Sequence, residues 1–498
     1  MTLFSPTCRL VMPFFLLALA IRLLISVQDI AYLDRLFLPD DTYYTLAISK
    51  HLFFNHEILT SGFQPLITLF QLPIFIFTED LDTAVKASIL ISAMIGAVST
   101  LLLGVLLAQI STPAASRFAM LFFAISPAIL INDLNGLETT LTGLLSLLVC
   151  LIFYFFIKKP AIEKAILLGV SCSLALLSRI DSVFLVFFIG LGLLYAVGVR
   201  WTFWVVFSAL VTILPWWVYL YMDFGSILPE SGKAVKQIIE KTPHNSLAAP
   251  FALYKLTDLL AIQSLGMVMS LAYRIVFLGF LLYCFYKVRF GQLPLVLKLA
   301  IASALCLVLF YTFYLPAYWF FERYFYWVFV VLIILISIAL TEIRSTFIRQ
   351  SLLALCILSA MLNIPLYFSQ PKAMPSLNLV GPKGYRDNAL AILTNLKDNS
   401  HVAAMQSGAL NYYAPKGVEV TNLDGVVNQA AYLATKQKTL YTYIKNIGVT
   451  HFADWHISRD ILIKDTNEQI NLACMVSLYS FKQGVNEAAL YDIRRCLL

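Results

Sequence analysis

Charged residues are scarce in this chain of 498 residues. Asp, Glu, Lys and Arg make up 13% of it and its mean hydropathy is +0.82, whereas soluble proteins contain about 25% charged residues. This shortage excludes an ordinary soluble enzyme and predicts a polytopic α-helical membrane protein. The net charge of +7 then gives no sign of a nucleic-acid partner, because basic residues of membrane proteins gather in cytoplasmic loops.

Metal-ligand spacings and a signal-cleavage site are also lacking. The eight cysteines include no CxxC pair, and five of them lie in apolar segments, as is typical of small buried side chains. No small-residue cleavage site follows the apolar run 10–29 before Asp34, so we expect a retained first helix. Cys474 and Cys496 lie in polar sequence. The sequence is compatible with a disulfide between them and equally with two free thiols.

Eleven apolar segments are near the length of about 20 residues that crosses a bilayer. They are 10–29, 83–109, 113–132, 137–157, 161–178, 182–198, 201–221, 263–286, 294–315, 323–341 and 349–368. A twelfth segment, 64–77, is short and contains Pro65 and Pro73. No internal repeat is visible, which argues against the repeat-built architecture of many transporters.

Loop charge indicates where segment 64–77 lies. If it does not span and the N-terminus is cytoplasmic, the basic loops fall on the cytoplasmic side, as the positive-inside rule prefers. These loops contain Arg117, Lys158, Arg200, Lys287 and Arg344. We therefore expect 64–77 to form a juxtamembrane helix on the outer face, within one long outer loop, 30–82.

The tail, residues 370–498, is polar, in contrast to the apolar residues 1–369. Strand-like runs at 401–405 and 418–420 alternate with a helical pattern at 427–446. This alternation predicts a small α/β domain. The topology above places that domain outside the cytoplasm.

An acidic pair opens the long outer loop. Asp40 and Asp41, followed by Tyr43 and Tyr44, begin a predicted amphipathic helix at 41–54. Carboxylates at a membrane rim are costly unless they serve a function, and a carboxylate can deprotonate a hydroxyl acceptor. N-capping of the helix is the alternative explanation.

Further charged residues lie at helix ends on the same outer face. They are Glu138, Arg179, Asp181, Glu230, Lys233, Glu322 and Arg323. Cations beside a general base suit an anionic lipid head group, because they neutralise its phosphate. Structural explanations stay open for each: a first-turn carboxylate at Glu138, a mutually neutralising Arg179–Asp181 pair, a solvated loop lysine, and an interfacial Glu322-Arg323 pair with a snorkelling arginine.

Several short motifs follow the acidic pair in a fixed order. They are Gly62-Phe63-Gln64-Pro65-Leu66, Gly136-Leu137-Glu138-Thr139, Arg179-Ile180-Asp181, Leu228-Pro229 with Lys233, and Arg323-Tyr324. Over nearly the whole chain this order resembles the GT-C superfamily of membrane glycosyltransferases, which use polyprenyl-phosphate sugars. The arabinofuranosyltransferase-like and mannosyltransferase-like bacterial group is the most similar. Ile180 and Glu230-Ser231 depart from the group's usual Pro and Asn-Thr, so the resemblance does not imply the identity of the donor sugar.

The resemblance implies a role for each residue. Asp40 would be the catalytic base, and Asp41 would orient the site. Donor-phosphate contacts are implied for Arg179, Lys233 and Arg323. Sugar or substrate contacts are implied for Tyr43, Tyr44, Gln64, Glu138, Asp181, Glu230 and Tyr324. An inverting displacement requires no cofactor in this group, and a divalent metal is compatible with the acidic residues but is not predicted.

We therefore expect a glycosyltransferase that moves a monosaccharide from a polyprenyl-phosphate donor to a glycan, lipid or protein hydroxyl. It would act at the outer face of a bacterial inner membrane, among membrane lipids. An oligosaccharide or phosphoglycan transferase of the same fold is the alternative enzyme. A lipid or glycan transporter and a ligand-binding scaffold are the other classes, and the position of the charges at helix ends argues against the transporter.

Overall fold

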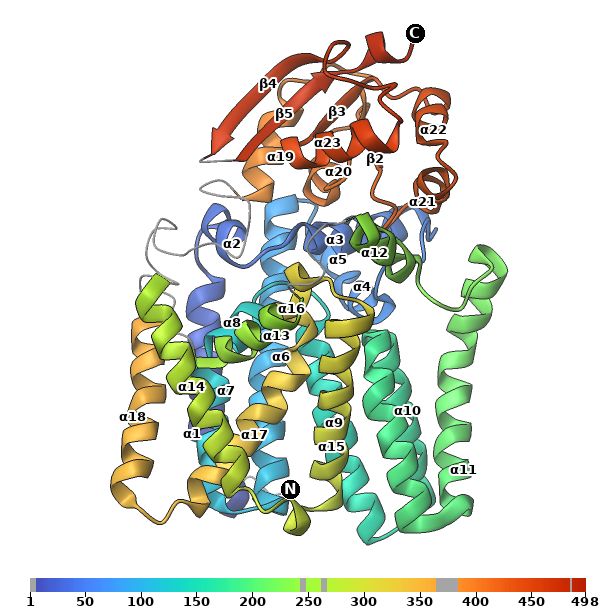
Figure 1. Cartoon of the computed structure of the whole chain (residues 1–498). Coiled ribbons are helices and arrows are strands. Elements are labelled where there is room, and N and C mark those ends of the chain that lie inside the picture. Colours follow the sequence, from blue (N-terminus) through green and yellow to red (C-terminus); the bar gives the residue numbers. More distant parts are fainter. Residues whose placement is uncertain (1–5, 242–247, 261–266, 364–383, 484–485) are drawn as a thin grey trace.

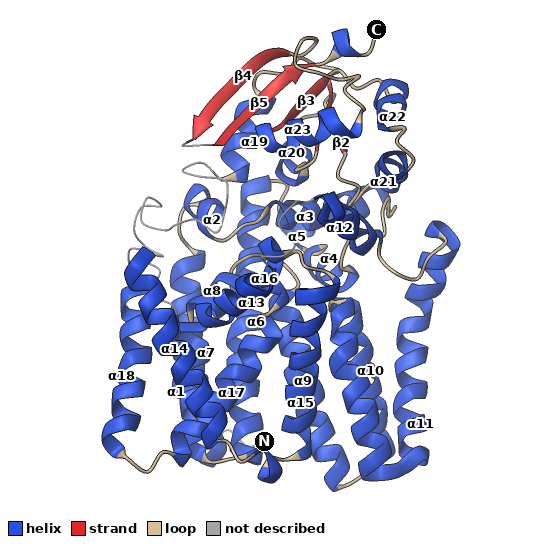
Figure 2. Cartoon of the chain, in the orientation of Figure 1, coloured by secondary structure: helices blue, strands red, loops and turns tan. Residues whose placement is uncertain are grey.

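The computed structural model consists of a helix bundle with a small sheet domain on one end of it (Figure 1). It describes residues 6–241, 248–260, 267–363, 384–483 and 486–498. All strands of the described residues lie in the sheet domain, and the bundle is helical (Figure 2). The end of the bundle that faces the sheet domain is called the tail side below.

Long apolar helices build the bundle. They are α1 (Pro6–Ser26), α6 (Leu81–Ile110), α7 (Pro113–Ile125), α9 (Thr139–Lys158), α10 (Ile162–Ser178), α11 (Val183–Phe224), α14 (Met267–Lys287), α15 (Leu295–Leu309), α17 (Tyr326–Glu342) and α18 (Thr346–Asn363). Among the described residues, four helices can each cross a membrane by length and composition, or seven if three bent pairs each form one span. The chain is a multi-pass membrane protein, and the count of eleven spans stays a prediction.

The predicted segments 182–198 and 201–221 both lie in α11. Gly198 interrupts this helix with a φ of +79° and a ψ of 177°, a conformation that L-residues with a side chain avoid. The interruption divides α11 into two helices and agrees with two separate segments. The ends of the predicted segments 263–286 and 349–368, and residues 370–383 of the tail, lie outside the described residues.

Bends move short helices out of line with the bundle on its tail side. The predicted segment 113–132 is broken, because α8 (Pro127–Asp133) turns away from α7 by 61° where Pro127 has no N–H to continue the helix. Likewise α2 (Ile30–Leu36) turns from α1 by 112°, and residues 318–324, which end in α16 (Phe321–Tyr324), turn from α17 by 54°.

Residues 30–82, the predicted first outer loop, form a layer between the bundle and the sheet domain (Figure 1). The predicted helix 41–54 is α3 (Asp40–Asn55). The segment 64–77 forms two short helices, α4 (Pro65–Gln71) and α5 (Ile74–Phe77), and neither can cross a membrane. Two further short helices are α12 (Glu230–Lys241) and α13 (Ala248–Leu256).

The sheet domain has five strands in the order β2-β1-β3-β5-β4. They are β1 (His401–Ala404), β2 (Glu419–Asn422), β3 (His451–Trp455), β4 (Val476–Gln483) and β5 (Asn486–Asp492). β1 is parallel to β2 and β3, and β5 is antiparallel to β3 and β4. The helices are α19 (Tyr385–Leu393), α20 (Gly408–Tyr413), α21 (Gln429–Lys436), α22 (Leu440–Asn446) and α23 (His456–Asp465). The predicted helical stretch 427–446 is thus two helices, and Cys474 and Cys496 form a disulfide.

A fully buried ion pair joins the helices of the bundle. Arg22 of α1 donates from Nε to Asp133 Oδ2 at 2.8 Å, and neither side chain is exposed to solvent. Asp133 also accepts from Tyr326 at 2.7 Å and from Thr140 at 3.1 Å. A Cβ on Gly96 of α6 would stand 2.4 Å from the same carboxylate. Five helices therefore meet at one charged group.

Removing one partner of this pair is expected to destabilise the protein. Arg22→Met or Asp133→Asn leaves the other group without its partner in an apolar interior, which costs about 3–5 kcal/mol. The variant carrying both changes is expected to lose less stability than the sum of the two. Thermal unfolding in detergent measures this, and fully additive losses would contradict coupling between the two residues.

Candidate active site

Arg179 occupies the centre of the candidate site. Its Nη1 lies 2.7 Å from Glu138 Oε1, its Nη2 lies 2.8 Å from Asp181 Oδ2, and all three side chains are buried. Tyr311 donates to Asp181 Oδ2 at 2.6 Å. The guanidinium is therefore held rigidly between two carboxylates. Glu138 makes no capping hydrogen bond to α9, so its side chain serves Arg179 rather than the helix end.

The side chains of the site lie where helices end or turn. Helix α10 ends at Ser178, and Arg179 is extended, with φ of −155°. On the other side of the site, Gly136 has a φ of +69°, and a Cβ there would approach the Thr42 side chain to 2.8 Å. Thr42 of α3 also donates to the Asn135 carbonyl at 2.6 Å. The turn before Glu138 is thus packed directly against α3.

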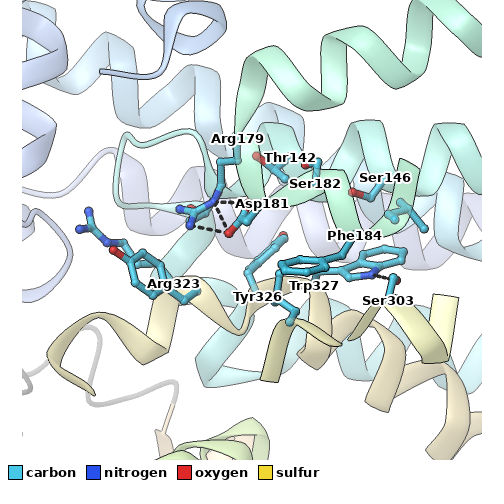
Figure 3. A pocket seen from close by; sticks show the side chains of 14 residues that line it. Thr142, Ser146, Arg179, Asp181, Ser182, Phe184, Ser303, Arg323, Tyr326 and Trp327 are labelled. Carbon is cyan, nitrogen blue, oxygen red and sulfur yellow. Dashed lines mark hydrogen bonds and ion pairs between the residues drawn. The ribbon is translucent and has the colours of Figure 1, made fainter. Parts of the chain in front are cut away.

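A pocket on the tail side contains both arginines of the site. Arg179, Asp181, Arg323 and Tyr324 line it, with Phe184 and Trp327 farther in. Figure 3 shows the Arg179 and Arg323 side chains toward one end, and Phe184 and Trp327 toward the other. Arg179 lies over the Tyr324 ring, 5.1 Å from its centroid, and Tyr324 stacks on Tyr311 with centroids 4.1 Å apart.

The two acids of the pair face different partners. Asp41 forms an ion pair with Arg323, and its side chain is 31% exposed. Asp40 is buried and accepts hydrogen bonds from the backbone N–H groups of Gly408 at 2.8 Å and Ala409 at 2.9 Å. Burial raises the pKa of Asp40 to about 7 against the opposing effect of these hydrogen bonds. Pro39 is the N-cap of α3, so neither acid caps this helix.

Tyr43 and Tyr44 are buried in contacts outside the pocket. The Tyr43 hydroxyl donates to Asp34 at 2.6 Å. The Tyr44 hydroxyl accepts from the Ser407 backbone and from Asn422 Nδ2, both at 2.9 Å. These tyrosines, which the resemblance assigns to substrate, connect α3 to α2 and to the sheet domain.

Three other predicted residues lie apart from the arginines. Lys233, near the start of α12, is exposed and donates to Ser226 in the preceding loop at 3.3 Å. Glu230 is buried at the start of α12, where its backbone N–H donates to Ser61 at 3.3 Å. Gln64 stands at the start of α4, half-buried. None of the three lines the pocket between Arg179 and Arg323.

A second ionic cluster lies next to the pocket and was not predicted. Asp258 binds Lys255 at 3.1 Å and Arg274 at 2.6 Å, and Lys255 also lies 3.7 Å from Glu322. Glu322 therefore faces Lys255 rather than its neighbour Arg323. Among the described residues, no group of three or more His, Cys, Asp or Glu side chains could hold a metal ion.

Comparison with solved structures shows which fold this is. The chain is similar to ArnT from Cupriavidus metallidurans, with a TM-score of 0.58 and 12% identity over 98% of this chain and 99% of that one. For the same protein bound to undecaprenyl phosphate the TM-score is 0.61, with 11% identity over 95% and 97%. The Archaeoglobus fulgidus oligosaccharyltransferase in complex with Zn and sulfate gives 0.52, with 12% identity over 88% and 68%.

These neighbours are membrane glycosyltransferases of the GT-C superfamily, and the chain has their fold. This confirms the fold that the resemblance implies. No protein-family model matches the sequence, and no curated protein does.

The close packing between α3 and the sheet domain predicts that a larger side chain at this contact weakens docking of the sheet domain on the bundle. A Cβ on Gly408 would stand 2.2 Å from the Asp40 carbonyl oxygen, so Gly408→Ala is expected to destabilise docking by about 1–3 kcal/mol. Limited proteolysis should release the sheet domain faster. Gly279→Ala is the control, because a Cβ there meets nothing within 4 Å. Equal protection of both variants would contradict the close contact.

Docking is also expected to depend on pH. Burial raises the pKa of Asp34 and Asp40, which both accept hydrogen bonds from the sheet domain, to about 7. The docked form therefore binds more protons than the undocked form, so its stability falls as pH rises from about 4 to about 7. The thermal midpoint measured between pH 5 and pH 8 should decrease, and Asp40→Asn should reduce the slope. A midpoint that rises with pH would contradict this.

Proposed function

We propose that this protein is an inverting glycosyltransferase that moves a monosaccharide from a polyprenyl-phosphate donor to a hydroxyl acceptor. The acceptor is a glycan, lipid or protein of the cell envelope. The observation that carries this proposal is the pocket in which Arg179 and Arg323 lie at one end, with Asp41 bound to Arg323. Guanidinium groups bind phosphate oxygens in a bidentate manner, and a carboxylate beside them can act as a base.

The balance of charge suggests how the donor enters. Arg179 already faces Glu138 and Asp181, so its positive charge is compensated. Arg323 is bound to Asp41. A donor phosphate that binds Arg323 displaces the Asp41 carboxylate, which then becomes free to accept a proton. Donor binding and activation of the base are thus one event.

This mechanism assigns the base to Asp41 instead of Asp40. Asp41 is partly exposed beside Arg323, which lines the pocket, whereas Asp40 is buried against Gly408 and Ala409. The acceptor oxygen attacks the anomeric carbon while its proton passes to Asp41. The bond between that carbon and the phosphate oxygen breaks, and polyprenyl phosphate leaves with the electron pair. Arg323 and Arg179 stabilise the charge that the phosphate gains.

We place the sheet domain outside the cytoplasm of a bacterial inner membrane, with the N-terminus cytoplasmic. The Cys474–Cys496 disulfide supports this side, because disulfides persist in oxidising compartments. The basic loops at the opposite end of the helices support the same orientation. An oligosaccharide transferase is the second candidate, favoured by the fold shared with the Archaeoglobus enzyme.

Replacing Asp41 tests the base. Asp41→Asn is expected to reduce transfer by about 10²–10⁴-fold and to keep binding of undecaprenyl phosphate. The assay follows release of polyprenyl phosphate from a panel of polyprenyl-phosphate sugars, with a cell-envelope glycolipid extract as acceptor. The mass of the product separates a monosaccharide from an oligosaccharide.

Two further variants complete this test. Glu79→Gln is the matched control, since Glu79 is exposed in the same outer loop. Asp40→Asn should retain transfer in the protein that stays docked, although its amide oxygen can accept only one of the two backbone N–H bonds. Full activity of Asp41→Asn together with loss of activity in Asp40→Asn would return the base to Asp40.

A further inference from the structure

A loop of the sheet domain contacts several of the elements near the candidate site. This loop, Asn422–Val426, follows β2 and is called the β2 loop. Asn422 donates to the Tyr44 hydroxyl of α3 at 2.9 Å. A Cβ on Gly62, in the first outer loop, would stand 1.8 Å from the Val426 carbonyl oxygen. The β2 loop is therefore seated on the residues that surround the acidic pair.

The same loop also packs against the aromatic wall of the pocket. Val426 joins an apolar cluster with Val235 and Ile239 of α12, Ala317 and Tyr324. Tyr324 is the ring on which Arg179 lies. Helix α12 lies beneath α21 and the end of β2 (Figure 1). The sheet domain thus packs on α12 and on Tyr324, which lines the pocket.

Asp424 is the carboxylate that the β2 loop presents. Its Oδ1 accepts from the Val426 N–H at 2.8 Å, and Asn422 Oδ1 accepts from the Gly425 N–H at 3.0 Å. These two bonds fix the shape of the loop and the direction of the Asp424 side chain. The residue is half-buried, so a ligand can reach it. Burial, together with repulsion by Asp41 and Asp40, raises the pKa of Asp424 to about 8.

We infer that Asp424 positions the acceptor of the transfer reaction, so that the sheet domain supplies one wall of the active site. The acceptor class is a polyol, such as a glycan or glycolipid, whose neighbouring hydroxyls can contact Asp424 and Asp41 together. Asp424 hydrogen-bonds one hydroxyl and directs another toward Asp41, which takes the proton. This inference rests on the proposed function and concerns its acceptor side.

A purely structural role for Asp424 would predict a different outcome. The Asx-type bond from the Val426 N–H goes to Oδ1 of Asp424, and the oxygen of an Asn side chain can also accept it. Asp424→Asn therefore keeps the loop and replaces the carboxyl group by an amide, which offers the acceptor different hydrogen bonds. A role in acceptor positioning is expected to raise the half-saturating acceptor concentration by about tenfold, with little change in the maximal rate.

The test uses the full-length protein in detergent, with the donor identified from the panel above. Release of polyprenyl phosphate is measured against increasing concentrations of the cell-envelope glycolipid extract. The variants are Asp424→Asn, Asp424→Glu and, as the control, Glu419→Gln, which changes an exposed acid on β2 itself. Affinity for undecaprenyl phosphate, measured separately, reports the donor side.

The expected result is a tenfold rise in half-saturation for Asp424→Asn, partial recovery in Asp424→Glu, and unchanged donor affinity and thermal midpoint in both. Unchanged half-saturation in Asp424→Asn would overturn the inference while leaving the proposed function intact. Equal loss of donor affinity and thermal stability would also overturn it, in favour of a structural role. No release from any donor by the unmodified protein would instead overturn the proposed function, and this inference with it.

Discussion

The buried ion pair between Arg22 and Asp133 fixes the position of the candidate site. Asp133 ends α8, and the Asn135-Gly136 turn and Glu138 follow within five residues. The turn packs on α3 and Glu138 holds Arg179. A displacement of Asp133 would therefore also move the turn that packs on α3 and the Glu138 side chain that holds Arg179. An unpaired charge at this depth is so unfavourable that the two residues hold α1 and α8 in one arrangement.

The acidic pair shows how adjacent residues on a helix divide two tasks. Successive side chains on an α-helix point about 100° apart, so Asp40 and Asp41 cannot face the same group. Asp40 points up to the sheet domain and Asp41 points to Arg323. The same geometry separates Tyr43 from Tyr44. One turn of α3 thereby holds the sheet domain in place and carries the proposed base.

Much of this arrangement could be predicted from local patterns. The run of apolar residues defines the helices, and two prolines in 64–77 limit its length. Residues at helix ends on one side of a bundle lie near one another, and the structure places Glu138, Arg179, Asp181, Arg323 and Tyr324 close together. The resemblance added their order and the fold.

The missed features depend on partners distant in sequence. Arg22 and Asp133 lie 111 residues apart inside apolar segments, and nothing in either segment indicates the other residue. Tyr311 reaches Asp181 across 130 residues. Motif order alone could not show that Asp40 binds the sheet domain or that Lys233 turns to Ser226, because a shared motif specifies a residue's position in the chain and not its contacts.

The Asp40 contact has a consequence for the sheet domain itself. In sheets with parallel strands, the crevice at the carboxyl ends of the strands where the strand order reverses, here beside β1, is the usual place for a phosphate-bearing nucleotide, held by backbone N–H groups at the start of a helix. In this protein a carboxylate of the same chain occupies those N–H groups at the start of α20. These N–H groups are therefore already bound by a tethered side chain, and a soluble anion would have to compete with a ligand that cannot diffuse away.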